Sequence, residues 1–209
     1  RLTAACIEGG TSIYTSGIDP GFGNVGLAVG ALGLCKQVDE VRMMEIVDYA
    51  TWDNPYTMFE IMGFGKADTR ESLLLSPGST AMAWGPVVAL VAEALEVELD
   101  EITEWHEVIR AEEPFEIASG TVPAGGISGM HFEIRGILDG RARIVVEHVT
   151  RLRGGDAPDW PQGAGYRVVV SGEPTVKVEL ELSSDRGDHN HAGCLATAMQ
   201  VLNAIPHVV

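Results

Sequence analysis

Three glycines near the start of the chain, Gly21, Gly23 and Gly26, have the G-x-G-x-x-G spacing of a dinucleotide-binding loop. A β-branched and aromatic segment precedes them and an apolar helical pattern follows. Asp48 comes about 20 residues later, where such sites place the acid that binds the ribose. Chemically, this arrangement would hold a pyrophosphate on backbone N–H groups at the start of a helix.

The surroundings of these glycines favour a structural crossover loop instead. Residues 17–20 separate the expected strand from Gly21, whereas a phosphate loop turns at the very end of its strand. Asp19 would place a carboxylate beside the phosphates, where two anions in a low dielectric repel by kilocalories. Gly26, Gly30 and Gly33 recur at the spacing that close packing of a helix against another backbone requires, and the sequence predicts no further βαβ units.

A second group of chemically active residues, Asp188, His189 and His191, occurs in the segment DHNHAG. Two histidines separated by one residue bind a metal only with a third and fourth ligand at suitable spacing, and the sequence does not supply them. We interpret Asp188 or Asn190 as a helix cap, with the imidazoles at the surface or at a substrate cleft. No metal site is predicted.

His106 and His148 lie in the alternating segments WHEV and VEHV, each beside a carboxylate. This pattern predicts that both histidines lie on the wetted face of a sheet. Glu107 and Glu147 share the pattern, so a pair of acids across neighbouring strands, as glycosidases use, stays open as an alternative.

The elements that must position these residues follow from the periodicity of apolar residues, which changes near Glu101 from about 3.6 to about 2. Helices are predicted over 1–9, 24–35, 54–62, 79–98 and 190–204, with Asn24 as one N-cap and Ser79 or Thr80 as another; strands are predicted over 11–18, 40–50 and repeatedly after 101. Asp139-Gly140 is a hairpin signal. The fold class predicted is α+β, with a mixed, largely antiparallel sheet and helices packed on one face.

The composition of the chain excludes some classes of function. The 209 residues include 30 acidic and 14 basic side chains, a formal charge of −16, which excludes a typical nucleic-acid partner. No apolar run reaches the roughly 18 residues of a membrane span, and the three cysteines are too dispersed to indicate a disulfide. We expect a soluble, cytoplasmic protein. A helical pattern already in progress at Arg1 also leads us to expect a fragment of a longer protein or a partly ordered chain.

Four stretches carry a family resemblance. GGTSIYTSGIDPGF, EVRMMEIVDYATWDNPYTMFEIMGFG, WHEVIRAEEPFEIASGTVPAGGISGMHFEIRG and ATAMQVLNAIP resemble the dihydrodipicolinate-reductase-like oxidoreductases that include 2,4-diaminopentanoate dehydrogenase and the native amine dehydrogenases. The resemblance covers essentially the whole chain. The H-H-x-x-K-x-D-x-P-S-G-T-A stretch of true dihydrodipicolinate reductases has no match here, so the resemblance favours amine or amino-ketone chemistry.

The resemblance implies a division of labour between two domains. Residues 1–23 would be the tail of a Rossmann domain and the crossover loop, and residues 24–209 a substrate-binding and dimerisation domain. The family's cofactor glycines and its catalytic glutamate would lie upstream of Arg1. The implied function is that of an NAD- or NADP-dependent dehydrogenase, a homodimer, acting on a small amine, imine or ketone. The alternative is a non-catalytic α+β binding or assembly module.

The resemblance also selects the residues of a substrate pocket. They are Asp19, Pro20, Phe22, Asp48, Tyr49, Thr51, Trp52, Asn54 and His191. Structural roles remain open for several of them. Asp19 before a proline can cap a turn, Phe22 and Trp52 can belong to the core, and Asn54 can be the N-cap of the helix that follows it.

Overall fold

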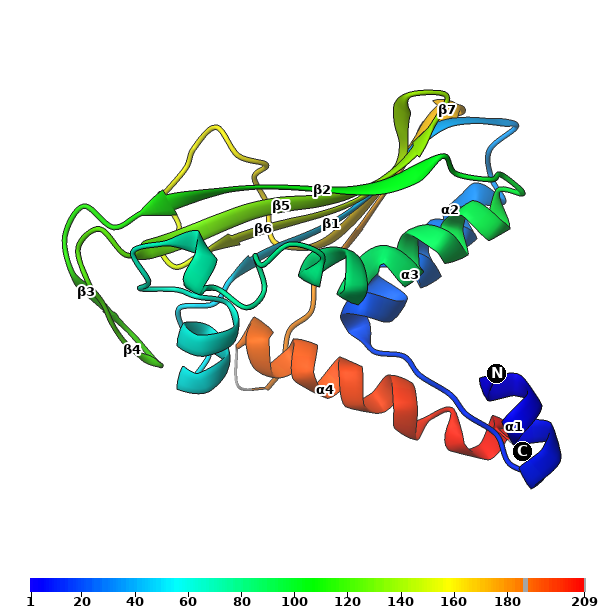
Figure 1. The fold of residues 1–209 in the computed structure, drawn as a ribbon, viewed down its shortest axis with the longest axis horizontal. Helices are drawn as coiled ribbons and strands as arrows, with labels where there is room; N and C mark the ends of the chain where they lie inside the picture. The colour runs from blue at the N-terminus through cyan, green and yellow to red at the C-terminus, as the bar shows by residue number, and fades with distance from the viewer. Residues whose placement is uncertain (186–187, 209) are drawn as a thin grey trace.

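The structure, a computed structural model, describes residues 1–185 and 188–208. A six-stranded sheet lies above a layer of helices (Figure 1). The helices are α1 (Leu2–Gly9), α2 (Leu27–Leu32), α3 (Ser79–Ala94) and α4 (His189–Leu202), with short helical turns η1 (Ile18–Gly26), η2 (Tyr56–Ile61), η3 (Thr69–Glu71) and η4 (Ile205–His207). The strands are β1 (Gln37–Asp48), β2 (Glu101–Arg110), β3 (Phe115–Ile117), β4 (Gly120–Val122), β5 (Ile127–Leu138), β6 (Arg141–Arg151), β7 (Gly165–Glu173) and β8 (Val176–Leu180).

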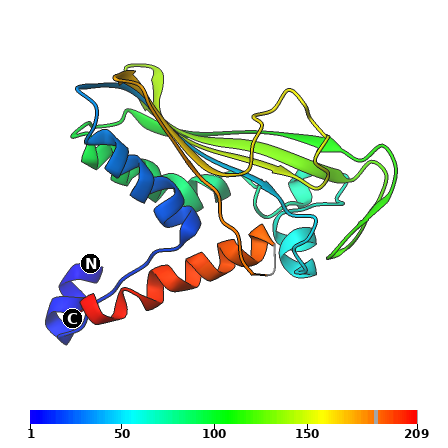
Figure 2. The same ribbon diagram turned by 180° about the vertical axis from the view of Figure 1, so that it is seen from behind.

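The sheet confirms the predicted fold class. Its strand order is β2-β5-β6-β1-β7-β8, and β3 pairs with β4 in a separate small sheet. β1 runs parallel to β6, whereas the other adjacent strands of the large sheet run antiparallel. The helices lie on one face, and the loop between β6 and β7, drawn in yellow, lies on the other (Figures 1 and 2). We call these the helix face and the outer face of the sheet.

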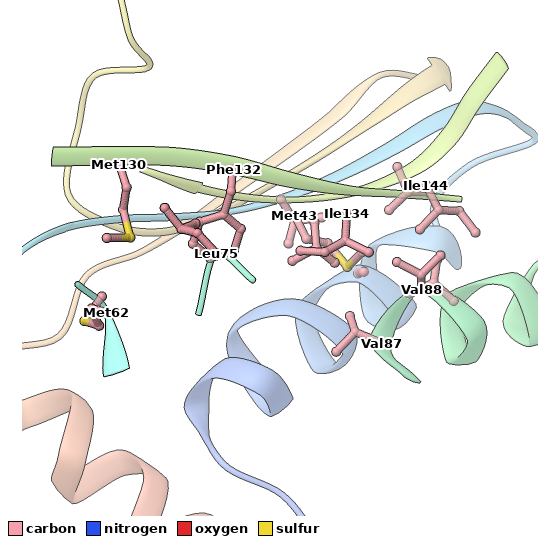
Figure 3. Close-up of a cluster of buried hydrophobic side chains, with 14 of the residues drawn as sticks. Met43, Met62, Leu75, Val87, Val88, Met130, Phe132, Ile134 and Ile144 are labelled. Carbon is pink, nitrogen blue, oxygen red and sulfur yellow. The ribbon is translucent and has the colours of Figure 1, made fainter. Parts of the chain in front are cut away.

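The main core lies between the helix face and α2 and α3. Met43, Phe132 and Ile134 extend from the sheet towards the helices, Val88 of α3 extends towards them, and Val87 of α3 lies beside α2 (Figure 3). All five are at most 3% exposed, so this layer is closed to water. Burial of each such side chain contributes about 1.5–3 kcal/mol to the stability of the fold. This burial determines which face of the sheet the helices cover. The polar residues of the cavity described below lie on this same face.

The connections follow the turn signals. Asp139 and Gly140 have φ values of 53° and 71°, both in the left-handed region that a type I′ hairpin requires. Leu138 accordingly pairs with Arg141 across the turn. The predicted hairpin is therefore confirmed.

Three local predictions were wrong. Residues 11–17 form no strand. Asn24 is not an N-cap, because helical backbone angles begin after Gly21 and the Asn24 side chain accepts a hydrogen bond from the Gly21 N–H at 2.8 Å. The helix predicted over 79–98 is α3, which ends at Ala94. Its first turn is capped not by Ser79 or Thr80 but by Glu104 of β2, whose carboxylate accepts a hydrogen bond from the Gly78 N–H at 2.7 Å. A carboxylate supplied by a distant strand cannot be recognised from the local sequence.

No helix in the described part of the chain combines the length and apolar character needed to cross a bilayer.

Candidate active site

A cavity of about 590 Å³ lies between the adjoining ends of β1 and β7 and the first turns of α4. Four acidic residues belong to its lining: Asp19, Glu45, Asp48 and Glu181. The aromatic rings of Tyr49, Trp52 and Tyr166 contribute much of the apolar wall. No lysine or arginine belongs to this lining, as far as the structure describes the chain. The cavity therefore combines apolar walls with negative charge, a combination that suits a small organic cation.

Behind two of these carboxylates lies His148, which is buried. β1 and β6 place Glu45 and His148 directly opposite each other in the parallel register. The Nδ1 atom of His148 lies 3.1 Å from Glu45 Oε2, and its Nε2 atom lies 3.5 Å from Asp19 Oδ1. The prediction that His148 faces water was wrong, because this stretch of β6 is covered by α3 and the η1 loop.

Aromatic residues fix the His148 ring in place. Phe132 stacks on it with centroids 4.6 Å apart and an interplanar angle of 11°. Trp84 of α3 meets the ring at 4.5 Å and 61°, and its Nε1 donates a hydrogen bond to Asp19 Oδ1 at 2.6 Å. The two ring nitrogens of His148 thus face different carboxylates, as in an ion-paired imidazolium.

The charge state of His148 follows from these contacts. Burial by itself lowers the pKa of His148, but the charges of Asp19 and Glu45 and their hydrogen bonds outweigh it and raise the pKa to about 10. His148 is therefore protonated at neutral pH.

This proton makes the fold sensitive to alkali. Since the folded pKa of His148 lies above the unfolded value of 6.5, its contribution to stability is fully present below that pH and is lost as the pH rises towards about 10. We expect the urea midpoint to fall over this range, and to fall less steeply in His148→Gln. His106→Gln, which changes an exposed histidine, serves as the control. Equal slopes for His148→Gln and wild type would contradict the prediction.

Two tyrosines complete the inner wall. The Tyr49 hydroxyl donates to Glu45 Oε2 at 3.3 Å. Burial, followed by the charge of Glu45, raises the pKa of both Tyr49 and Tyr166. Both phenols therefore stay neutral, and the Tyr49 proton is directed to Glu45. Their oxygen lone pairs are then free to accept hydrogen bonds from a ligand in the cavity.

The glycine loop supports this wall. A Cβ on Gly23 would lie 2.7 Å from Tyr166 Cδ1, so the loop passes directly against the tyrosine ring. Its amides are occupied: the Gly21 N–H by Asn24, and the Phe22 N–H by the Gly17 carbonyl at 2.9 Å. The loop therefore does not fit a pyrophosphate, and the interpretation as a structural crossover loop is supported.

The structure brings together some of the predicted pocket residues and separates others. Asp19, Asp48, Tyr49 and Trp52 line the cavity. Thr51 lies beside it and accepts a hydrogen bond from the Asn190 amide at 2.9 Å, an interaction that joins the end of β1 to α4.

The remaining predicted residues lie elsewhere. Pro20 and Phe22 line a separate groove of about 450 Å³ against α3. Asn54 caps η2 by accepting from the Thr57 N–H at 3.2 Å, as its structural alternative predicts. His191 does not line the cavity, whereas His189 does. Asp188 caps α4 through the Asn190 N–H, as expected.

Sequence reasoning missed Glu45, His148 and Tyr166. A signal existed for Glu45, because a carboxylate inside the apolar segment MMEIV of a central strand requires a buried partner. Finding that partner needs the parallel register of β1 and β6, which no local pattern shows.

A second ionic cluster lies on the outer face. His131 of β5 bridges two acids, with Nδ1 3.2 Å from Glu107 Oε1 and Nε2 2.9 Å from Glu147 Oε1. Arg42 of β1 contacts Glu147 and also Glu133, the latter at 2.7 Å. The glycosidase-like pair was therefore wrong, because an imidazole fills the space between the two acids and the cavity lies on the other side of the sheet.

Comparisons with known proteins identify this architecture. Amine dehydrogenase from Mycobacterium smegmatis, a solved structure, matches with a TM-score of 0.65 and 15% identity over 92% of this chain and 53% of that one. The fold is thus that of part of a dehydrogenase. The sequence model of the 2,4-diaminopentanoate dehydrogenase C-terminal domain matches residues 26–209. The chain belongs to this family.

A curated relative gives the same result. An amine dehydrogenase of Streptomyces virginiae is 39% identical over 216 residues, covering 100% of this chain and 59% of the relative. The chain therefore spans less than two thirds of that relative's length.

Proposed function

We propose that residues 24–209 are the substrate-binding and oligomerisation domain of a cytoplasmic, NAD- or NADP-dependent dehydrogenase that acts on amines or imines. The acidic cavity carries this proposal. A primary amine is a cation at neutral pH, and an imine becomes one when protonated. Asp19, Glu45, Asp48 and Glu181 supply negative charge without a competing lysine or arginine in the lining, so the cavity favours the nitrogen end of such a substrate.

A nicotinamide cofactor supplies hydride transfer to or from the carbon that bears the nitrogen. The glycine loop of this chain does not fit the cofactor's pyrophosphate, and we assign none of the chain's residues to it. The chain's own contribution is binding and orientation. Tyr49 and Tyr166 present acceptor lone pairs to an N–H group, and Trp52 adds an apolar wall that excludes water.

We also propose that the chain forms a homodimer through the outer face of the sheet. On this face Trp105 is 36% exposed, and the Arg135 guanidinium lies 5.4 Å from its ring centroid. Exposed aromatic and arginine side chains are enriched in protein interfaces.

Nicotinamide absorbance tests the proposed activity. The intact gene product that contains this chain is expected to reduce NAD or NADP with members of a panel of primary amines and not with the matching alcohols. Removing one lining charge by Glu181→Gln is expected to raise the KM for the amine about tenfold, the loss of one charge-assisted contact. Glu101→Gln makes the same change at an exposed site on β2 and is the control.

Two results would contradict this function. One is the absence of nicotinamide turnover across the amine panel. The other is equal turnover of amines and alcohols, because the proposal attributes selectivity to the charge of the cavity.

A further inference from the structure

We propose that His148 is a positioning residue that holds Asp19 and Glu45 as a fixed pair of negative charges at the inner wall of the cavity, where they bind the nitrogen-bearing end of the substrate. This inference rests on the proposed function for the nature of the substrate. The arrangement of the three side chains is independent of it.

The placement of the three side chains supports this role. Asp19 and Glu45 both line the cavity, whereas His148 does not, so His148 acts on a ligand only through them. The three side chains come from η1, β1 and β6 and are only 4%, 9% and 4% exposed, respectively. Three distant segments thus converge on a buried ion cluster beside a cavity, an arrangement common at functional sites.

The charges of the three side chains also support this role. Two buried carboxylates on one wall repel each other unless a cation lies between them. His148 lies between Asp19 and Glu45, with a nitrogen facing each. The imidazolium thereby offsets their repulsion, and the cluster has a formal net charge of one negative unit to offer a cationic ligand.

The surroundings of the cluster make it rigid. Tyr49 donates a hydrogen bond to Glu45, and Trp84 donates one to Asp19. No further charged side chain contacts His148 among the described residues. Phe132 covers the remaining ring face. Because these contacts hold both carboxylates in place while leaving lone pairs for a ligand, the cluster does not rearrange when a ligand enters, which is how preorganised sites gain affinity.

The test uses His148→Gln in the intact protein, with His106→Gln as the matched control. We expect the KM for an amine substrate to rise about tenfold, the loss of one charge-assisted contact, with a smaller change in kcat. We also expect the acidic limb of the pH profile of kcat/KM to move to higher pH, because the imidazolium that offsets the repulsion between the two carboxylates is gone. A merely structural role would lower activity without moving that limb.

The double variant His148→Gln/Glu45→Gln sharpens the test. It restores the net charge of the cluster by removing one carboxylate along with the imidazolium. We expect its acidic limb to move back towards the wild-type position. An unmoved limb in the single variant, together with a wild-type KM, would overturn the proposal.

Two measurements decide the proposal even if the variant does not fold or the protein shows no turnover. In the wild-type protein, the His148 imidazole is expected to stay protonated from pH 6 to pH 9 by NMR, consistent with its raised pKa. An ordinary titration near pH 6.5 would overturn the proposal. Calorimetry with butylammonium chloride as the probe is expected to show weaker binding at pH 4 than at pH 8, because the acid-rich lining as a whole is less negative in acid. Equal affinity at both pH values would also overturn it.

Discussion

Replacing Arg42 with methionine is expected to lower the free energy of unfolding by about 3 kcal/mol at pH 7, the low end of the range for breaking a buried ion pair. Glu147 and Glu133 are 3% and 7% exposed, so losing Arg42 leaves two acids with little access to water. The loss stays at the low end because His131 still contacts Glu147 and Arg135 still contacts Glu133. Urea unfolding measures it.

The pH dependence of this loss identifies its cause. Burial raises the pKa of Glu147, but His131 and Arg42 together lower it below 4.5, so its stabilising contribution is present above that pH and is lost as the pH falls through the folded pKa. The deficit of Arg42→Met is therefore expected to shrink in acid. Arg141→Met, at an exposed hairpin position, should change stability by less than about 0.5 kcal/mol. A deficit that is equal at pH 4 and pH 7 would contradict this account.

Replacing Phe132 with alanine is expected to cost about 3–5 kcal/mol of stability, the usual loss for a large aromatic residue in a closed core. Phe132 is 1% exposed and contacts both Trp84, at 5.3 Å between ring centroids, and His148. The space left behind lies next to the ion cluster, so we also expect the His148 ring to lose its fixed orientation. Thermal and urea unfolding measure the first effect, and the KM for an amine measures the second.

Tyr56→Ala is the matched control for this substitution. Tyr56 is 66% exposed, so its loss is expected to change stability by less than about 0.5 kcal/mol. A similar loss in the two variants would show that the space around Phe132 collapses without cost, contrary to the packing described above.

Much of the fold could be predicted from the sequence because its signals are local. The change in the period of apolar residues near Glu101 predicts the strands. The pair Asp139-Gly140 predicts a hairpin, because both residues adopt the positive φ values that its turn requires. The segment 11–17 shows the limit of this reasoning. Its β-branched residues suit a strand, but no neighbouring strand is available to pair with it, and strand propensity depends on such context.

The candidate site was predictable only in part, because its members meet through tertiary contacts. Asp19 and Tyr49 were selected through the family resemblance and do line the cavity. His148 was predicted to lie on the water-exposed face of the sheet, because the alternation of apolar and polar residues cannot tell which face of a strand a helix will cover. In the same way, the sequence pattern marks Glu104 only as one more polar residue of an alternating strand, and its capping role follows from the position of α3 beside it.

The central position of β1 has a consequence for how the protein is made. β1 leaves the ribosome before any of its neighbours in the sheet, since Val41 pairs with Ile144 on one side and Val170 on the other. Until translation has passed residue 170, the apolar segment 41–47 lacks a complete set of partners and is exposed to aggregation. We therefore expect this segment of the nascent chain to stay unpaired for longer than the strands of a sheet that assembles from consecutive hairpins.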